Sequence, residues 1–233
     1  MNHFNYIPNF SYFIEFHNVD DEISVFINTN YNRVIKTRSK GIHNITDSLI
    51  YGKVNLIRVE GTNFKGGDYA HPNRYSFTYD IYKVNNSTNE KTIIGRHTDN
   101  GISNQNQDLL LNVQTFIIDD FLSSSENVLQ FFLKVEKADN VFAAWVNGND
   151  VCGISTEGNP SYDWMVDITE ACIPGQNIIS FTGNGGGGNH FKFSVWKHFY
   201  HGANSTKNYY KKIISYDTNS SFNNLNVPFL NTP

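Results

Sequence analysis

Two loops of the chain combine residue types that could recognise a sugar. One spans residues 63–74; the other spans residues 184–190, and residues 159–164 are expected to lie near it. Amide and carboxylate groups bond to sugar hydroxyls, and an aromatic face packs on the C–H surface of the ring. We expect the ligand-binding residues to be Asn63, Asp68, Tyr69, His71, Asn73, Tyr162, Asp163, Trp164, Asn184, Asn189 and His190.

The same loops leave other interpretations open. Asn and Asp oxygens suit calcium, so calcium is a candidate cofactor, but the carboxylates are few and their spacing is not diagnostic. The glycines at 185–188 allow positive φ, which a hairpin connection without a ligand also uses. The alternative for Trp164 is a partly buried position at the rim of the loop.

No group of residues has the spacing that a known catalytic mechanism requires. The sequence has no His-Glu-x-x-His, no zinc-type cysteine pair, no Gly-x-Ser-x-Gly and no phosphate-binding loop. The adjacent carboxylates at 20–21 and at 119–120 would point to opposite sides of a strand, whereas a glycosidase needs two that face one sugar. We therefore expect a protein that is not an enzyme.

Alternating apolar residues predict the strands that must hold these loops. Residues 75–81 and 191–195 place apolar side chains at every second position, the period of a strand with one buried face. Asn147-Gly148 is a strong hairpin signal. The 33 asparagines fit many turns, although an AT-rich coding sequence would enrich asparagine as well. The chain is expected to be all-β.

An internal repeat organises these strands. Its segments are residues 20–30 and 139–149, 43–52 and 166–175, 55–61 and 177–183, and 77–83 and 191–197. The repeat predicts two tandem jelly-roll or β-sandwich modules, at 1–86 and 87–200, with the polar stretch 85–91 as the boundary. Residues 201–233 are expected to form a polar tail whose spaced aromatic residues pack on a module or on a neighbouring chain.

Three short segments of the second copy carry a family resemblance. They are Val146-Asn147-Gly148, Val166-Asp167-Ile168-Thr169 and Pro174-Gly175-Gln176-Asn177-Ile178-Ile179. Together they resemble the galactose-binding-domain-like jelly-roll modules that accompany glycoside hydrolases and many lectins. The resemblance implies the fold, but the matched residues belong to the scaffold and identify no ligand. The loops at 61–73 and 183–189 are also similar in composition to a loop of small calcium-dependent galactose-binding bacterial lectins.

Composition and charge exclude several partners. A net charge of −4 with scattered Lys and Arg offers no basic face for nucleic acid. No apolar run reaches the roughly 18 residues of a membrane-spanning helix. Residues 1–6 lack the basic and apolar regions of a secretory signal. We expect an extracellular, virion or cell-surface location reached without a visible signal, with the cytoplasm left open, and we expect Cys152 and Cys172 to be buried thiols.

These features favour a non-enzymatic, lectin-like protein that binds glycans, with tandem modules giving avidity. The alternative is a structural or adaptor protein of a virion, fibre or surface assembly. In that alternative, jelly-roll modules make protein–protein contacts, either in a homo-oligomer or with an assembly partner.

Overall fold

The computed structural model describes residues 9–28, 33–65, 73–103, 109–118, 127–155, 161–185, 190–201 and 209–231. Within these residues the regular elements are strands and two single-turn 3-10 segments, η1 (Thr46–Ser48) and η2 (Thr169–Ala171). The strands up to residue 118 are β1 (Phe10–Val19), β2 (Glu22–Ile27), β3 (Arg33–Thr37), β4 (Gly41–Asn44), β5 (Asn55–Asn63), β6 (Asn73–Asn85), β7 (Lys91–Ser103) and β8 (Leu109–Ile118). The later strands are β9 (Asn127–Lys137), β10 (Val141–Val146), β11 (Asn149–Ser155), β12 (Ser161–Asp167), β13 (Gly175–Asn184), β14 (Phe191–His201), β15 (Tyr209–Thr218) and β16 (Phe222–Asn231).

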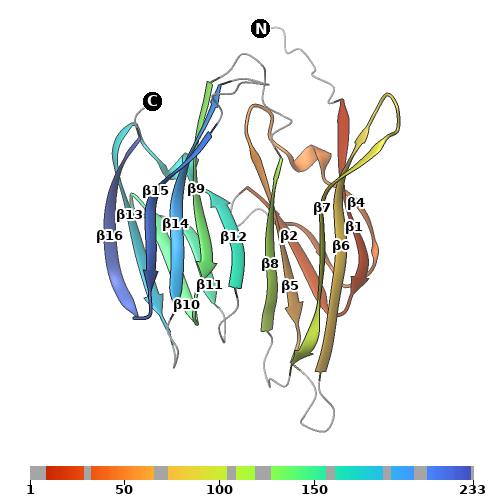
Figure 1. Cartoon of the computed structure of the whole chain (residues 1–233), viewed down its shortest axis with the longest axis horizontal. Coiled ribbons are helices and arrows are strands. Elements are labelled where there is room, and N and C mark those ends of the chain that lie inside the picture. The colour runs from red at the N-terminus through yellow and green to blue at the C-terminus, as the bar shows by residue number, and fades with distance from the viewer. Residues whose placement is uncertain are drawn as a thin grey trace.

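The described strands form four antiparallel sheets, which stack in pairs as two sandwiches side by side (Figure 1). The first sandwich joins the sheets β4-β1-β6-β7 and β3-β2-β5-β8. The second sandwich joins the sheets β12-β9-β14-β15 and β11-β10-β13-β16. Strands β9 to β16 thus pair in the same order as β1 to β8. The predicted all-β sandwich architecture is confirmed, and the strand complement of each sandwich is that of a jelly roll.

The strand pairing moves the predicted boundary between the modules. Strand β7 pairs with β6 along its length, and β8 pairs with β5. Strands β7 and β8 therefore belong to the first sandwich. The polar stretch 85–91 is the turn of the β6–β7 hairpin, closed by a 2.9 Å bond from the Asn85 N–H to the Glu90 carbonyl. A polar turn and a polar linker have the same composition, which explains the misplaced boundary.

The predicted tail is also part of a sandwich. Strand β15 pairs with β14 and β16 pairs with β13, so residues 209–231 supply one strand to each sheet of the second sandwich. Its apolar side chains pack on the second core: Ile213, Ile214, Tyr216, Phe222, Leu225, Val227 and Phe229. The expectation that these residues pack on a module is met by strand pairing rather than by surface docking.

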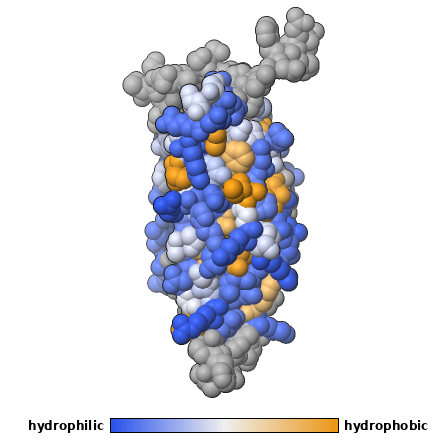
Figure 2. Space-filling model, turned by 90° about the vertical axis from the view of Figure 1, so that its right-hand side faces the viewer, coloured by the Kyte–Doolittle hydropathy of each residue, from blue (hydrophilic) through white to orange (hydrophobic). Residues whose placement is uncertain are grey.

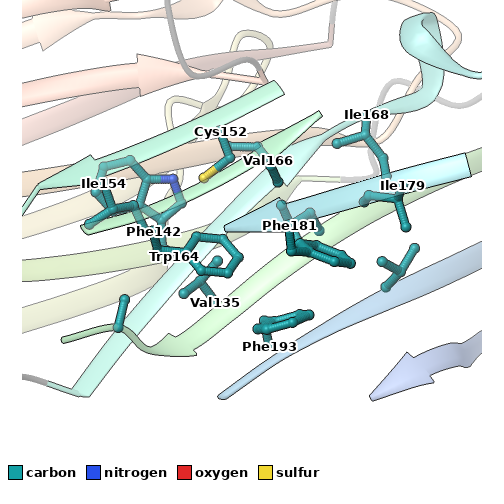
Figure 3. Close-up of a cluster of buried hydrophobic side chains, with 14 of the residues drawn as sticks. Val135, Phe142, Cys152, Ile154, Trp164, Val166, Ile168, Ile179, Phe181 and Phe193 are labelled. Atoms are coloured by element: carbon teal, nitrogen blue, oxygen red, sulfur yellow. The ribbon is translucent and has the colours of Figure 1, made fainter. Parts of the chain in front are cut away.

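Each sandwich has its own apolar core, built from the inward side chains of alternating strands. In the first, Ile14, Ile23, Ile57 and Ile81 are fully buried among their neighbours from both sheets. In the second, aromatic rings fill the space between the sheets, with the Phe181 and Phe193 centroids 4.3 Å apart (Figure 3). Burial of one face explains the period of two in strands such as β13, whereas β2 and β5 are buried on nearly every residue.

The same asparagine contacts hold equivalent turns in both sandwiches. Asn28 and Asn147 adopt positive φ, 65° and 51°, at the ends of β2 and β10. Each donates its side-chain amide to a second asparagine: Asn28 to Asn55 at 3.0 Å, and Asn147 to Asn177 at 2.7 Å. Asn55 and Asn177 in turn each accept a backbone N–H from the preceding turn at 2.8 Å. These side chains complete buried backbone hydrogen bonding where the strands end.

A shared apolar cluster joins the two sandwiches. Val54 and Leu56, at the start of β5, pack with Phe132 of β9 and Met165 of β12, and Trp196 lies partly buried against them. Val113 of β8 extends further and forms part of the second core. The second sandwich therefore covers the outer face of β5 and β8 in the sheet β3-β2-β5-β8.

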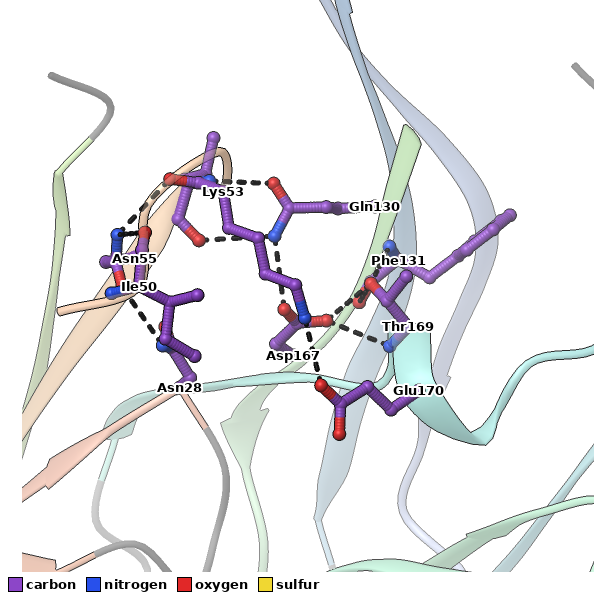
Figure 4. A network of polar contacts seen from close by, with 10 residues as sticks. Asn28, Ile50, Lys53, Asn55, Gln130, Phe131, Asp167, Thr169 and Glu170 are labelled. Carbon is purple, nitrogen blue, oxygen red and sulfur yellow. Dashed lines mark hydrogen bonds and ion pairs between the residues drawn. The ribbon is translucent and has the colours of Figure 1, made fainter. Parts of the chain in front are cut away.

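Polar contacts fix the same junction (Figure 4). The buried Gln130 side chain accepts the Val54 N–H at 2.9 Å and donates to the Val54 carbonyl at 3.2 Å. The Asp167 N–H donates to the carbonyl of Asn28 at 2.9 Å, and Lys53 pairs with Glu170 at 2.9 Å. These contacts link the end of β2 and the start of β5 to β9, β12 and η2 of the second sandwich.

Candidate functional site

The first predicted loop is closed at its base by its own asparagines. Asn63 ends β5 and is 1% exposed; its side-chain oxygen accepts from the Asn73 amide at 3.1 Å. Asn73 also donates to the carbonyl of Phe64 at 2.8 Å, and the Phe64 N–H donates to Asp21 at 2.6 Å. Because Asn63 is buried, it supports the loop rather than presenting its amide on the surface.

The second predicted loop is bordered by described residues that also bond within the chain. Asn184, the last residue of β13, is exposed. His190 lies 2.8 Å from the carboxylate of Asp217 on β15, and the Gly185 N–H donates to Ser221 at 3.2 Å. Of these, Asn184 keeps an exposed side chain on the loop border.

Asp163 and Trp164 do not lie on a surface loop. They belong to β12, at the junction with the first sandwich. The Asp163 carboxylate pairs with Lys134 at 2.9 Å, and its backbone carbonyl accepts the hydroxyl of Thr115 from β8. Asp163 therefore links the two sandwiches.

Trp164 is 5% exposed and is packed in the second core (Figure 3). The Arg58 guanidinium, from β5 of the first sandwich, stacks 4.3 Å from its ring centroid and 4.4 Å from that of Phe26. Arg58 pairs with Glu60 at 2.7 Å, and burial raises the pKa of the Glu60 carboxyl. The expectation of a sugar-stacking Trp164 is corrected, because a cation from the neighbouring sandwich already covers its ring.

The remaining candidates lie outside the described residues. These are Asp68, Tyr69, His71 and Asn189, together with the side chain of Tyr162.

An open hollow of ≈ 490 Å³ lies beside the first loop, at one end of the first sandwich. Asp20 lines it from the β1–β2 turn, residues 74–76 from the start of β6, and residues 100–102 from the end of β7. Strand register brings the last two groups together, since Arg74 pairs with Ile102 and Ser76 with Asn100. Asn73, a predicted site residue, directly precedes Arg74.

Tyr75 and Gly101 shape this hollow. They pair directly across β6 and β7, and a Cβ on Gly101 would lie 2.5 Å from the Tyr75 hydroxyl oxygen. The tyrosine ring therefore lies across the glycine, in a place that a larger residue would occupy. Burial, followed by the charge of Asp99, raises the pKa of the Tyr75 hydroxyl, so it remains a neutral hydrogen-bonding group.

The groups around the hollow suit a polar, uncharged ligand. Arg74 and Asn100 supply donors, Asp20 supplies acceptors, and Ser76 supplies a hydroxyl of either kind. Partial burial and the neighbouring charge of Asp21 raise the pKa of Asp20. One aromatic side chain among convergent polar groups is the composition that binds a sugar ring with its hydroxyls.

Sequence reasoning missed most of this hollow. Arg74 was assigned to the edge of the loop, and Tyr75 was assigned to the core by its alternation with Phe77. Placing residues 100–102 beside them requires the register of the β6–β7 hairpin, which spans a turn that looked like a linker. The sequence signal for the hollow is therefore the β6–β7 hairpin, because it predicts which residues of the two strands lie side by side.

Among the described residues, no group of three His, Cys, Asp or Glu side chains is placed to hold a metal ion. The described part of the chain also has no helix of sufficient length and apolar character to span a membrane. Comparisons with protein-family models, with curated proteins and with solved structures found no match to this chain.

Proposed function

We propose that this chain is a non-enzymatic carbohydrate-binding protein, and that the hollow at the end of the first sandwich takes part of a glycan. The observation that carries the proposal is the convergence of Asp20, Arg74, Tyr75 and Asn100 on one open concave surface. Sugars are bound by such mixtures of planar polar groups and one aromatic face. Asp68, Tyr69 and His71 lie outside the described residues and stay predictions from the sequence.

A glycan array tests the proposal, with Arg74→Ala as the main variant. Arg74 is exposed, so its loss should leave the fold intact, while removing a charged donor should weaken glycan binding by roughly tenfold. Lys40→Ala is the matched control, since it removes one exposed positive charge from a turn outside the hollow. A wild-type protein that binds no glycan, or Arg74→Ala binding that equals the control, would contradict the proposal.

Calcium is proposed as a cofactor only for the loop that contains Asp68. Repeating the array with a chelator separates the two modes of binding. If calcium bridges the glycan, chelation abolishes the signal and added calcium restores it. Undiminished binding in chelator assigns recognition to the side chains of the hollow alone.

A second candidate function is a structural or adaptor role, favoured by one row of apolar side chains. On the outer face of the sheet β4-β1-β6-β7, Phe13 of β1, Tyr82 of β6 and Ile93 of β7 lie at paired positions. Ile42 of β4 pairs with Glu15 and so lies diagonally next to Phe13. The Phe13 and Tyr82 rings stack at 5.4 Å, and Ile42 is 59% exposed. Figure 2 shows this side of the molecule, where apolar side chains stand in separate groups among polar ones.

Sedimentation velocity distinguishes this second function. An assembly protein that uses the row should form a defined oligomer, which the double substitution Ile42→Glu and Ile93→Glu should dissociate. The row is excluded as an interface between copies if the protein binds glycans and sediments as a monomer at all concentrations, and if the double substitution leaves its sedimentation unchanged.

A further inference from the structure

The face of the second sandwich that packs against the first carries three large apolar side chains. Phe132 of β9, Met165 of β12 and Trp196 of β14 lie in the apolar cluster that joins the two sandwiches. Phe132 pairs with Trp196 on one side and with Asp167 of β12 on the other. Met165 is 8% exposed, because this face is covered within the chain.

The apolar row on the outer face of the sheet β4-β1-β6-β7 has the same arrangement in the first sandwich. Phe13 pairs with Tyr82 of β6 and with Asn44 of β4, as Phe132 pairs with its two neighbours in the second sandwich. Ile42 precedes Asn44 by two residues, and the methionine of β12 precedes the paired aspartate by two residues as well. Here, however, Ile42 is 59% exposed.

Backbone hydrogen bonds beside these residues show the same correspondence. The Tyr12 N–H, one residue before the phenylalanine of the row, donates to the Thr46 hydroxyl at 2.8 Å. The Phe131 N–H, one residue before the phenylalanine of the junction, donates to the Thr169 hydroxyl at 2.9 Å. The row therefore occupies, on the first sandwich, the position from which the second sandwich makes the internal junction.

The surface that receives this face within the chain also has a counterpart, on the outer side of β13 and β16. Leu56 of β5 packs in the junction and directly follows Asn55. Ile178 of β13 directly follows Asn177, which accepts a backbone N–H from the preceding turn as Asn55 does. Ile178 is 47% exposed, and its strand partner Pro228 is exposed as well.

We propose that a second copy of this chain packs its apolar row against the outer face of β13 and β16, and so repeats between copies the junction that exists within each chain. The two faces lie on opposite sides of the molecule (Figure 1). Contact between two different faces is heterologous, so each added copy leaves a free face at both ends of the assembly. Burial of the exposed apolar side chains drives the association.

The contact between copies should be weaker than the internal junction. Within the chain, Arg58 stacks on the Trp164 ring at 4.3 Å. The strand registers place Ser180 and Gly41 at the corresponding positions, so this stack is not repeated between copies. Loss of a buried cation–aromatic contact lowers the affinity, and we expect association that is reversible and depends on protein concentration.

Sedimentation velocity tests the proposal when one face is blocked at a time. The sedimentation coefficient of the wild-type protein should rise with concentration beyond that of a dimer. Ile42→Glu blocks the row and Ile178→Glu blocks the receiving face, because each places a charge in an apolar contact. Each variant alone should be monomeric, whereas an equimolar mixture should form a dimer, since each variant keeps the face that the other lacks.

Val141→Glu is the matched control. Val141 is 43% exposed and lies at the other end of the same sheet face, paired with Asn184, so this variant should associate like the wild type. Melting curves verify that the variants are folded. Leu230→Glu on β16, at a position 61% exposed, blocks the receiving face a second way if Ile178→Glu does not fold.

Three results would overturn the proposal: a wild-type protein that is monomeric at all concentrations, a mixture of the two variants that stays monomeric, or self-association of Ile178→Glu equal to that of the wild type. The proposal rests on the structural role, the second candidate function, and is independent of glycan binding. Self-association of Ile178→Glu would indicate a symmetric contact of row against row, which keeps the structural role while excluding the head-to-tail contact.

Discussion

Asparagine side chains form hydrogen bonds with backbone groups that have no strand partner where the strands begin and end. Asn177 is fully buried and bonds the turn before β13 on both sides: it accepts from Ile173 at 2.8 Å, and donates to the carbonyls of Ile173 at 2.8 Å and Gly175 at 3.1 Å. Asn55 makes the corresponding contacts before β5. A carboxylate could accept these bonds but not donate them, which explains why an amide is required.

We expect Asn177→Ala to lower the free energy of unfolding by about 2–3 kcal/mol, because several buried backbone groups lose their partners. Asn55→Ala should have a similar effect. Urea denaturation measures both. Asn223→Ala is the control, since its exposed side chain bonds only to Thr182 among the described residues, at 3.1 Å, and it should change stability by about 0.5 kcal/mol or less. Equal effects in all three variants would assign the network no special role.

Asp80 is the centre of an ion-pair cluster on β6. Arg96 holds it with two bonds, at 2.7 and 2.9 Å, and His17 lies 3.2 Å from it. The hydrogen bonds from Arg96 lower the pKa of Asp80 from 3.8 to about 2. A depressed carboxyl pKa stabilises the folded state above pH 3.8, and that contribution is lost as the pH falls through 2.

Arg96→Ala should therefore raise the pKa of Asp80 toward its ordinary value, and the variant should lose stability at a higher pH than the wild type during acid denaturation. An NMR titration of the Asp80 side chain measures the first effect, and circular dichroism measures the second. Lys40→Ala should change neither. An Asp80 pKa that stays near 2 without Arg96 would show that another group controls it.

At the scale of elements, the sequence predicted the strands better than their partners. The alternation in residues 75–81 reports one buried face, and strand β6 follows it. The same alternation cannot say whether an outward side chain meets solvent or another sandwich. Contacts between distant segments bury Trp164 and Arg58 and hold the half-buried Asp163. A polar, aromatic-rich segment therefore looked like a binding loop although it lies at the junction.

The buried Arg58 makes the junction testable. Arg58→Ala leaves Glu60 buried without its cation and uncovers the Trp164 ring, so it should lower the free energy of unfolding by about 3 kcal/mol or more. Arg58→Leu combined with Glu60→Leu should recover part of that loss, because no unpaired charge remains. Denaturation followed by tryptophan fluorescence compares the variants. A single variant as stable as the wild type would contradict a structural role for the pair.

The whole molecule is two sandwiches locked by one interface, so we expect them to unfold together. Val54, Leu56, Phe132 and Met165 form one buried cluster, and Gln130 bonds the backbone of Val54 across the interface. Calorimetry should give one transition, with calorimetric and van't Hoff enthalpies in agreement. Two separate transitions in the wild type would show that the interface is too weak to couple the sandwiches. Gln130→Ala should broaden or split the transition.

The position of Val113 makes the two sandwiches unequal during synthesis. Among the described residues, the core of the first sandwich is built from positions up to 118, whereas Val113 of the first sandwich is part of the second core. Because synthesis starts at the N-terminus, the first sandwich can fold before the second has been made. The second sandwich then folds against the surface of the first. Reversing the order by circular permutation would expose the flank beside Trp164 on the nascent chain, and would make the permuted protein prone to aggregation while it is still being made.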